Sequence, residues 1–154
     1  MQQLNIDIGV EEFQVNGRGI LRFNPGDPNL YHRFFDARET LAGLDEELTR
    51  KAAALEARAD LSEEARAAEQ LLLLAEYDGR IKALLTGIFS GQNDFDSILE
   101  GVNLAGVGTN GRRVVCNLLD ALTPVLQQGA RRTVERTAAQ AAADADRARA
   151  ARGA

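Results

Sequence analysis

The chain of 154 residues contains one histidine, His32, and one cysteine, Cys116, the side chains most suited to act as a general base or a nucleophile. His32 follows Tyr31 at the start of a predicted helix, and no second histidine is present to complete a metal cluster. Cys116 lies on the apolar side of another predicted helix, which is typical of a small core residue. We expect His32 at the surface or domain boundary and no catalytic thiol. A lone cysteine forms no internal disulfide, which fits a reducing cytoplasm.

Carboxylates are frequent, but their spacing indicates helix faces and caps rather than an acid–base pair. Glu46-Glu47 and Glu63-Glu64 fall within predicted helices, where acidic residues near an N-terminus stabilise the helix. Asp94-Phe95-Asp96 lacks the further oxygen ligands of a calcium loop. The sequence therefore predicts no catalytic residue, no metal site and no cofactor, and we expect a protein that is not an enzyme.

Residues 106–111, Gly-Val-Gly-Thr-Asn-Gly, match the G-x-G-x-x-G pattern and precede a predicted helix. The dinucleotide-binding form of this pattern requires a core strand before it and an acidic residue about 20 positions after it. The segment before it is Gly101-Val102-Asn103-Leu104-Ala105, and helix follows it to the end of the chain. We interpret the pattern as a flexible loop.

The C-terminal part of the chain is basic, whereas the rest is acidic. Residues 1–100 hold 19 acids and 10 bases, and residues 101–154 hold 4 acids and 8 bases. Clustered arginines can bind phosphates, but aromatic stacking partners are missing and Glu135, Asp144 and Asp146 dilute the charge. This segment is predicted to be a solvated helix, with a protein-binding or a nucleic-acid-binding helix as the alternatives.

The elements that hold these residues begin with a β-hairpin over residues 4–23. Leu4, Ile6 and Ile8 alternate with polar residues, and Asn16-Gly17 separates two further apolar runs. Asparagine and glycine both accept the positive φ of a tight hairpin turn. We expect two or three short strands whose apolar face lies on the helices, because an isolated hairpin is only marginally stable.

Helical periodicity then predicts helices at about 28–59, 62–89 and 112–128. Asp27 before Pro28 forms a helix start, and either Asp60 or Ser62 caps the next helix. The first two helices form an antiparallel hairpin about 45 Å long at 1.5 Å per residue. The first helix carries apolar residues alternately four and three positions apart, a near-heptad coiled-coil pattern: Leu30, Phe34, Ala37, Leu41, Leu44, Leu48 and Leu55.

Between residues 90 and 111, glycine and asparagine interrupt the helical pattern, leaving one short helical turn capped at Asp94 or Asp96 and a mobile glycine-rich region. Pro124 is expected to kink the last helix or to start a new segment. After Gly129 almost nothing remains to bury. We expect a single globular domain over residues 1–129 and, over 130–154, an exposed helical or frayed Ala/Arg-rich tail. The predicted fold class is α+β, mainly α.

The order of these motifs resembles the tail assembly chaperones of long-tailed phages and prophages of Gram-positive bacteria. The resemblance lies in Val15-Asn16-Gly17, in Leu21-Arg22-Phe23-Asn24 and in the Arg33-Phe34 pair of the following helix. Further similarity lies in Ile88-Phe89-Ser90-Gly91, in Ile98-Leu99-Glu100-Gly101 and in an amphipathic helix over 115–122. It covers roughly residues 10–126, and the Ala/Arg-rich tail lies outside it.

This resemblance implies a non-enzymatic protein that binds the long, helical tape measure protein and keeps it soluble in the bacterial host cytoplasm until the tail tube assembles. No apolar run approaches the length of a membrane span, so we expect no membrane association. An exposed strand edge would permit sheet continuation between copies, so a homo-oligomer is expected.

A long helical pair can present a groove to an amphipathic partner helix, and six apolar residues are the expected contacts. Leu72 and Leu73 broaden the apolar side of the second helix, and the others flank the glycine-rich region: Phe89, Phe95, Ile98 and Leu99. Alternatively these residues close the domain's own core. The competing function is a phage-encoded nucleic-acid-associated protein that acts through the arginine-rich helix, which we consider the less favoured reading.

Overall fold

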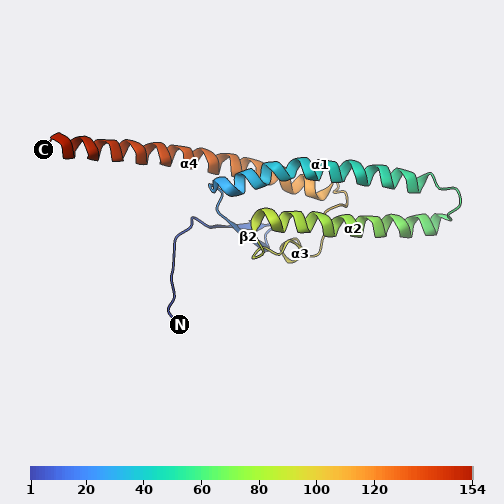
Figure 1. Cartoon of the computed structure of the whole chain (residues 1–154). Coiled ribbons are helices and arrows are strands. Elements are labelled where there is room, and N and C mark those ends of the chain that lie inside the picture. Colours follow the sequence, from blue (N-terminus) through green and yellow to red (C-terminus); the bar gives the residue numbers. More distant parts are fainter. Residues whose placement is uncertain (154) are drawn as a thin grey trace.

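The structure, a computed structural model, describes residues 1–153. It is mainly helical, with an N-terminal two-stranded antiparallel hairpin, an antiparallel helix pair and a long C-terminal helix, which confirms the predicted fold class (Figure 1). The elements in chain order are β1 (Glu11–Val15), β2 (Gly19–Phe23), α1 (Pro28–Glu56), α2 (Glu63–Phe89), α3 (Phe95–Ile98) and α4 (Val114–Gly153).

The β-hairpin forms around the predicted Asn16-Gly17 turn. Both residues have positive φ, 52° and 76°, and the Arg18 N–H donates to the Val15 carbonyl at 3.1 Å. The sheet is shorter than predicted, because residues 1–10 form no strand. This N-terminal segment instead leaves the body as an extended arm (Figure 1).

The helix starts follow local capping chemistry. Asp27 caps α1 by accepting from the Asn29 N–H at 2.9 Å, with Pro28 as the first helical residue. Of the two candidate caps for α2, Ser62 is the one used, and its hydroxyl accepts from the Ala65 N–H at 3.1 Å. The α1 helix ends at Glu56, three residues before the predicted end.

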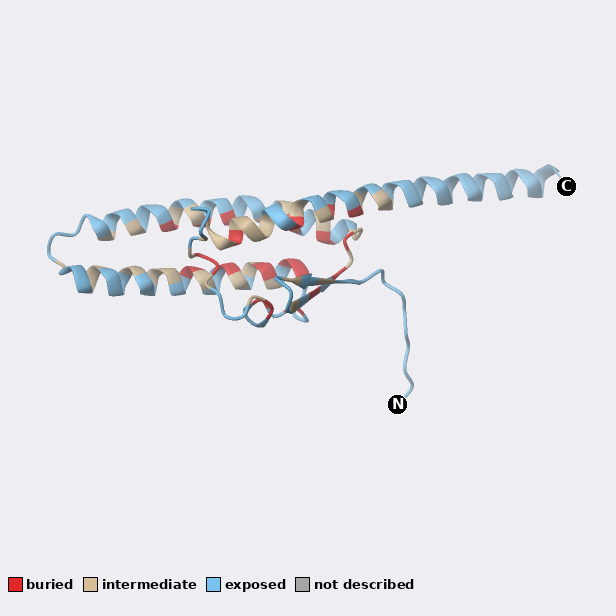
Figure 2. Ribbon diagram, turned by 180° about the vertical axis from the view of Figure 1, so that it is seen from behind, coloured by how far each residue is buried: buried red, intermediate tan, exposed pale blue. Residues whose placement is uncertain are grey.

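The core lies at the end of the helix pair where the sheet packs (Figure 2). Phe23 on β2 stacks on Phe13 with ring centroids 4.7 Å apart and meets the edge of Phe89 at 5.1 Å. Phe34 from α1 is fully buried in the same cluster. By contrast, no residue from 49 to 76 is buried, so the distal part of the helix pair consists of two helices without a third layer.

The α4 helix is one continuous helix of 40 residues. It passes through Pro124, so neither the expected new segment nor a helix end near residue 128 occurs. Pro124 is exposed, as is Asp120, whose carbonyl loses its helical partner, so water can satisfy that carbonyl. Every described residue from Val134 onward is exposed, as predicted for the tail.

Two close backbone approaches hold α4 against the loop before α1 and strand β2 against α3. A Cβ at Gly129 of α4 would lie 2.0 Å from the Pro25 carbonyl oxygen, and one at Gly19 of β2 would lie 2.1 Å from the Ile98 carbonyl oxygen. The Thr133 hydroxyl also donates to the Gly26 carbonyl at 2.7 Å. Glycine at these two positions therefore permits contacts that any side chain would block.

Candidate interaction groove

The six predicted contact residues separate into two groups. Phe89, Phe95 and Ile98 are buried in the core, and Leu99 is half-buried against it. These four side chains belong to the domain's own core, as the alternative prediction stated, and form no open contact surface. Leu72 is 64% exposed and Leu73 is half-buried, so the predicted surface survives on α2 alone.

Asn93 explains why the residues after α2 turn into the core. Its side chain is 3% exposed and accepts from the Arg22 N–H at 2.9 Å. The same amide donates to the Arg22 carbonyl at 2.7 Å and to the Phe89 carbonyl at 2.9 Å. Asn93 thus ties the end of α2 to strand β2 and sets the position from which α3 begins.

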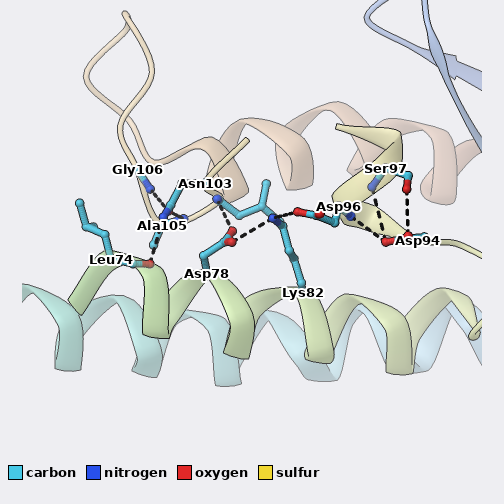
Figure 3. A network of polar contacts seen from close by, with 10 residues as sticks. Leu74, Asp78, Lys82, Asp94, Asp96, Ser97, Asn103, Ala105 and Gly106 are labelled. Carbon is cyan, nitrogen blue, oxygen red and sulfur yellow. Dashed lines mark hydrogen bonds and ion pairs between the residues drawn. The ribbon is translucent and has the colours of Figure 1, made fainter. Parts of the chain in front are cut away.

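Part of the glycine-rich region is bound to α2 by polar contacts (Figure 3). Leu104 and Ala105 are fully buried. The Asp78 carboxylate accepts from the Leu104 N–H at 2.7 Å, and the Asn103 amide donates to the Leu74 carbonyl at 3.1 Å. Because Asn103 and Leu104 both hydrogen-bond to α2 and Leu104 and Ala105 are buried, this segment is part of the core.

Lys82 links this segment to α3 (Figure 3). Its ammonium lies 2.9 Å from the Asp78 carboxylate and 2.6 Å from that of Asp96. Burial opposes the charged form, but the hydrogen bonds to Asp96 and Asp78 outweigh it and raise the pKa of Lys82. The aspartates at 94 and 96 therefore have structural partners: Asp94 caps α3, and Asp96 pairs with Lys82.

A shallow apolar groove of about 380 Å³ runs between α1 and α2. Its α2 side is formed by Arg80, Ala83 and Leu84, and its α1 side by Thr40 and Leu44. Leu44 was predicted on the apolar side of its helix, but none of these residues was predicted as a partner contact. The sequence shows which residues share a face of each helix. It does not show which faces of α1 and α2 lie next to each other, so the groove between them could not be predicted.

Charged residues border the groove toward the distal end of the helix pair. Glu47 lies 3.2 Å from Lys51 and 3.5 Å from Arg80. Lys51 and Arg80 also cover the buried ring of Tyr77, at 5.3 and 4.8 Å from its centroid. The proximity of the Tyr77 hydroxyl, the Lys51 ammonium and the Arg80 guanidinium lowers the pKa of Glu47 below its ordinary value.

The predicted leucines lie on the same side of α2 as the groove. Leu73, Arg80 and Leu84 recur at spacings of seven and four residues, which places them on one side of the helix. Leu72 precedes Ala83 by eleven residues, about three helical turns, and lies at the solvent edge of the same side. Leu72 and Leu73 therefore add apolar surface on the groove side of α2, beyond the charged residues that border the groove and where no third layer covers the helix pair.

The residues suited to catalysis do not gather at this groove. His32 is exposed, as predicted, and Cys116 is half-buried against the core. Residues 106–111 form a loop between α3 and α4 with no strand before it, in agreement with the loop interpretation. Within residues 1–153, no three His, Cys, Asp or Glu side chains lie close enough to hold a metal ion. No described helix is both long and apolar enough for a membrane span.

The arginine-rich end of α4 is partly neutralised along its own helix. Arg147 pairs with Asp144, and Arg149 pairs with Asp146. Arg132 lies nearer the body, with its guanidinium 3.6 Å from Glu11 of β1. These pairs reduce the charge that the helix would offer to a phosphate backbone.

Comparisons of the chain with protein-family models, with curated proteins and with solved structures find no significant match.

Proposed function

We propose that this protein is a non-enzymatic tail assembly chaperone, which binds an amphipathic helix of a phage tape measure protein in the groove between α1 and α2. The proposal rests on the motifs that resemble this family and, above all, on the groove and the exposed apolar residues farther along the same side of α2. The chaperone would act in the cytoplasm of the bacterial host and release its partner when the tail tube assembles.

The shape and chemistry of the groove support a helical partner. An amphipathic helix binds in an apolar groove through residues spaced three and four apart, with polar groups at the rim. Here Leu44, Ala83 and Leu84 supply apolar surface, and Glu47 with Arg80 supplies charges of both signs beside it. Leu72 and Leu73 lengthen the contact by two to three turns, as a long tape measure helix would require.

The test is co-expression of this chain with candidate tape measure proteins, which are long proteins of coiled-coil sequence. The proposal predicts that the tape measure protein stays in the supernatant only when this chain is present, and that the two proteins purify together. Failure of both, with each protein expressed at normal levels, contradicts the proposal.

A pair of adjacent leucines on α2 gives a matched test of the groove. Leu72 is 64% exposed and lies on the groove side of α2, whereas Leu71 is 68% exposed and points about 100° away around the helix. Leu72→Asp should weaken partner binding about tenfold or more, because a charge replaces a buried apolar contact. Leu71→Asp should leave binding unchanged. Equal effects of the two variants would show that the groove is not the binding surface.

A further inference from the structure

The N-terminal arm has the pattern of a strand but no partner. Leu4, Ile6 and Ile8 alternate with polar residues, and their side chains are 89%, 75% and 66% exposed. The arm is extended and leaves the body without contacting the helices (Figures 1 and 2). Three large aliphatic side chains on one side of an extended segment are typical of a strand with one buried face.

The base of the arm is fixed so that the arm points away from its own sheet. The Asn24 amide donates to the Ile8 carbonyl at 3.0 Å, and the Asp7 carboxylate accepts from the Gly9 N–H at 2.9 Å. Gly9 has a φ of 76°, which turns the chain between the arm and β1. The arm therefore starts from the Asn24 end of the sheet and does not lie along β1 of its own chain.

One edge of the two-stranded sheet is closed and the other is open. On β2, the Asn93 side chain occupies both the N–H and the carbonyl of Arg22, and Ile98 packs against Gly19. The backbone N–H and carbonyl of Arg22 point away from β1. In an antiparallel pair, those of its partner Glu12 therefore point away from β2, and so do those of Gln14 two residues on. Within residues 1–153, the backbone groups of Glu12 and Gln14 form no hydrogen bond on that outer side.

An apolar groove of about 270 Å³ adjoins this open edge. Phe13 and Val15 of β1 form one side, and Leu118 and Val125 of α4 form the other. All four side chains are half-buried. A strand added beside β1 would place alternate side chains in this groove while its backbone pairs with Glu12 and Gln14, the arrangement of strand addition.

We propose that the N-terminal arm of one copy adds as a strand to the β1 edge of a second copy, and that two copies exchange their arms. Each of the three aliphatic side chains buries about 100 Å² of its own surface, so one arm buries about 300 Å² and a reciprocal pair about 600 Å². The groove lining and the backbone pairing along each β1 edge add to this area, which gives an interface at the small end of those that proteins form. The arm and the edge that it fits belong to the same sequence, which makes a second copy the occupant.

The first test is the oligomeric state of the full chain, measured by sedimentation over a range of concentrations. The proposal predicts a dimer or larger assembly that Ile6→Asp weakens by about tenfold or more. Asn5→Asp adds the same charge on the polar side of the arm and should leave assembly unchanged. Gln14→Pro removes an outward N–H from β1 and should weaken assembly from the acceptor side. A monomeric full chain, or equal effects of the Ile6 and Asn5 variants, would overturn the proposal.

The second test locates the contact by cross-linking in a Cys116→Ser background, which has no other cysteine. One tagged copy carries Asn5→Cys in the arm, and a copy of different size carries Gln14→Cys on the edge. A short bismaleimide should join the two different copies, and the matched control Glu63→Cys, at the far end of the helix pair, should give no product. A third sample carries both Asn5→Cys and Gln14→Cys on one chain. If this chain is cross-linked only within itself and the two different copies are not joined, the arm folds onto its own sheet and the proposal is overturned. These outcomes are independent of whether a tape measure protein binds the helix-pair groove.

Discussion

Substitution of Gly129 by alanine tests how α4 is docked on the body. A Cβ at this position would lie 2.0 Å from the Pro25 carbonyl oxygen and 2.3 Å from its carbon. Relief requires α4 to move back by about 1–1.5 Å, since unstrained heavy-atom contacts lie near 3.5 Å. That movement loosens the packing of Leu122 and Leu126, both buried.

The expected net effect combines two opposing contributions. Overpacking against a backbone carbonyl costs about 3 kcal/mol, and the better helix propensity of alanine returns about 1 kcal/mol. Gly129→Ala should therefore lower the free energy of unfolding by about 2 kcal/mol and Tm by about 4–8 °C. The measurement is urea and thermal unfolding followed by circular dichroism, with the m value compared between variants.

Gly43→Ala provides the matched control. Gly43 is exposed on α1, and no heavy atom lies within 4 Å of the place that an alanine methyl group would take, so only helix propensity changes. This variant should raise the free energy of unfolding by about 1 kcal/mol. If Gly129→Ala stabilises the protein as Gly43→Ala does, α4 does not approach Pro25 as described and the packing argument is refuted.

Two further predictions concern the segment between α2 and α3. Asn93→Ala leaves the backbone groups of Arg22 and the Phe89 carbonyl without their partner. It should lower the free energy of unfolding by about 2–4 kcal/mol, measured by urea unfolding. A loss below about 1 kcal/mol would contradict this prediction. Hydrogen bonds from the Ser97 hydroxyl and from backbone N–H groups lower the pKa of Asp94 below its ordinary 3.8. As the pH falls, Asp94 is protonated in the unfolded chain before it is protonated in the folded one. The contribution of Asp94 to the free energy of unfolding is therefore complete above pH 3.8 and is lost as the pH falls through the lowered pKa. Asp94→Asn should flatten the decline of the urea midpoint below pH 3.8, and an unchanged decline would count against it.

Features set by neighbouring residues could be predicted from the sequence. The Asn16-Gly17 turn and the Asp27-Pro28 helix start depend on backbone angles and on hydrogen bonds within three residues. The helix pair followed from apolar periodicity, which reports one buried face without naming what covers it. These elements formed where predicted, within a few residues.

Features that depend on distant partners could not be predicted. Leu104 and Ala105 lie among glycines, and their burial follows from contacts with distant residues of α2: the Leu104 N–H donates to Asp78, and the Asn103 amide donates to the Leu74 carbonyl. Phe89 was predicted at the surface because its sequence neighbours do not show that the β-hairpin covers it, with Phe23 against its ring. The groove residues likewise become neighbours only through the crossing of α1 and α2.

The most direct test of the proposed function is site-specific photo-cross-linking in the complex with the tape measure protein. A photoreactive residue replaces Ala83 in the groove or, as a control, Ala143 on the projecting part of α4, both of which are exposed. We predict a cross-link to the tape measure protein from position 83 and none from position 143. A cross-link from position 143 alone would move the binding surface to the arginine-rich helix and contradict the central claim.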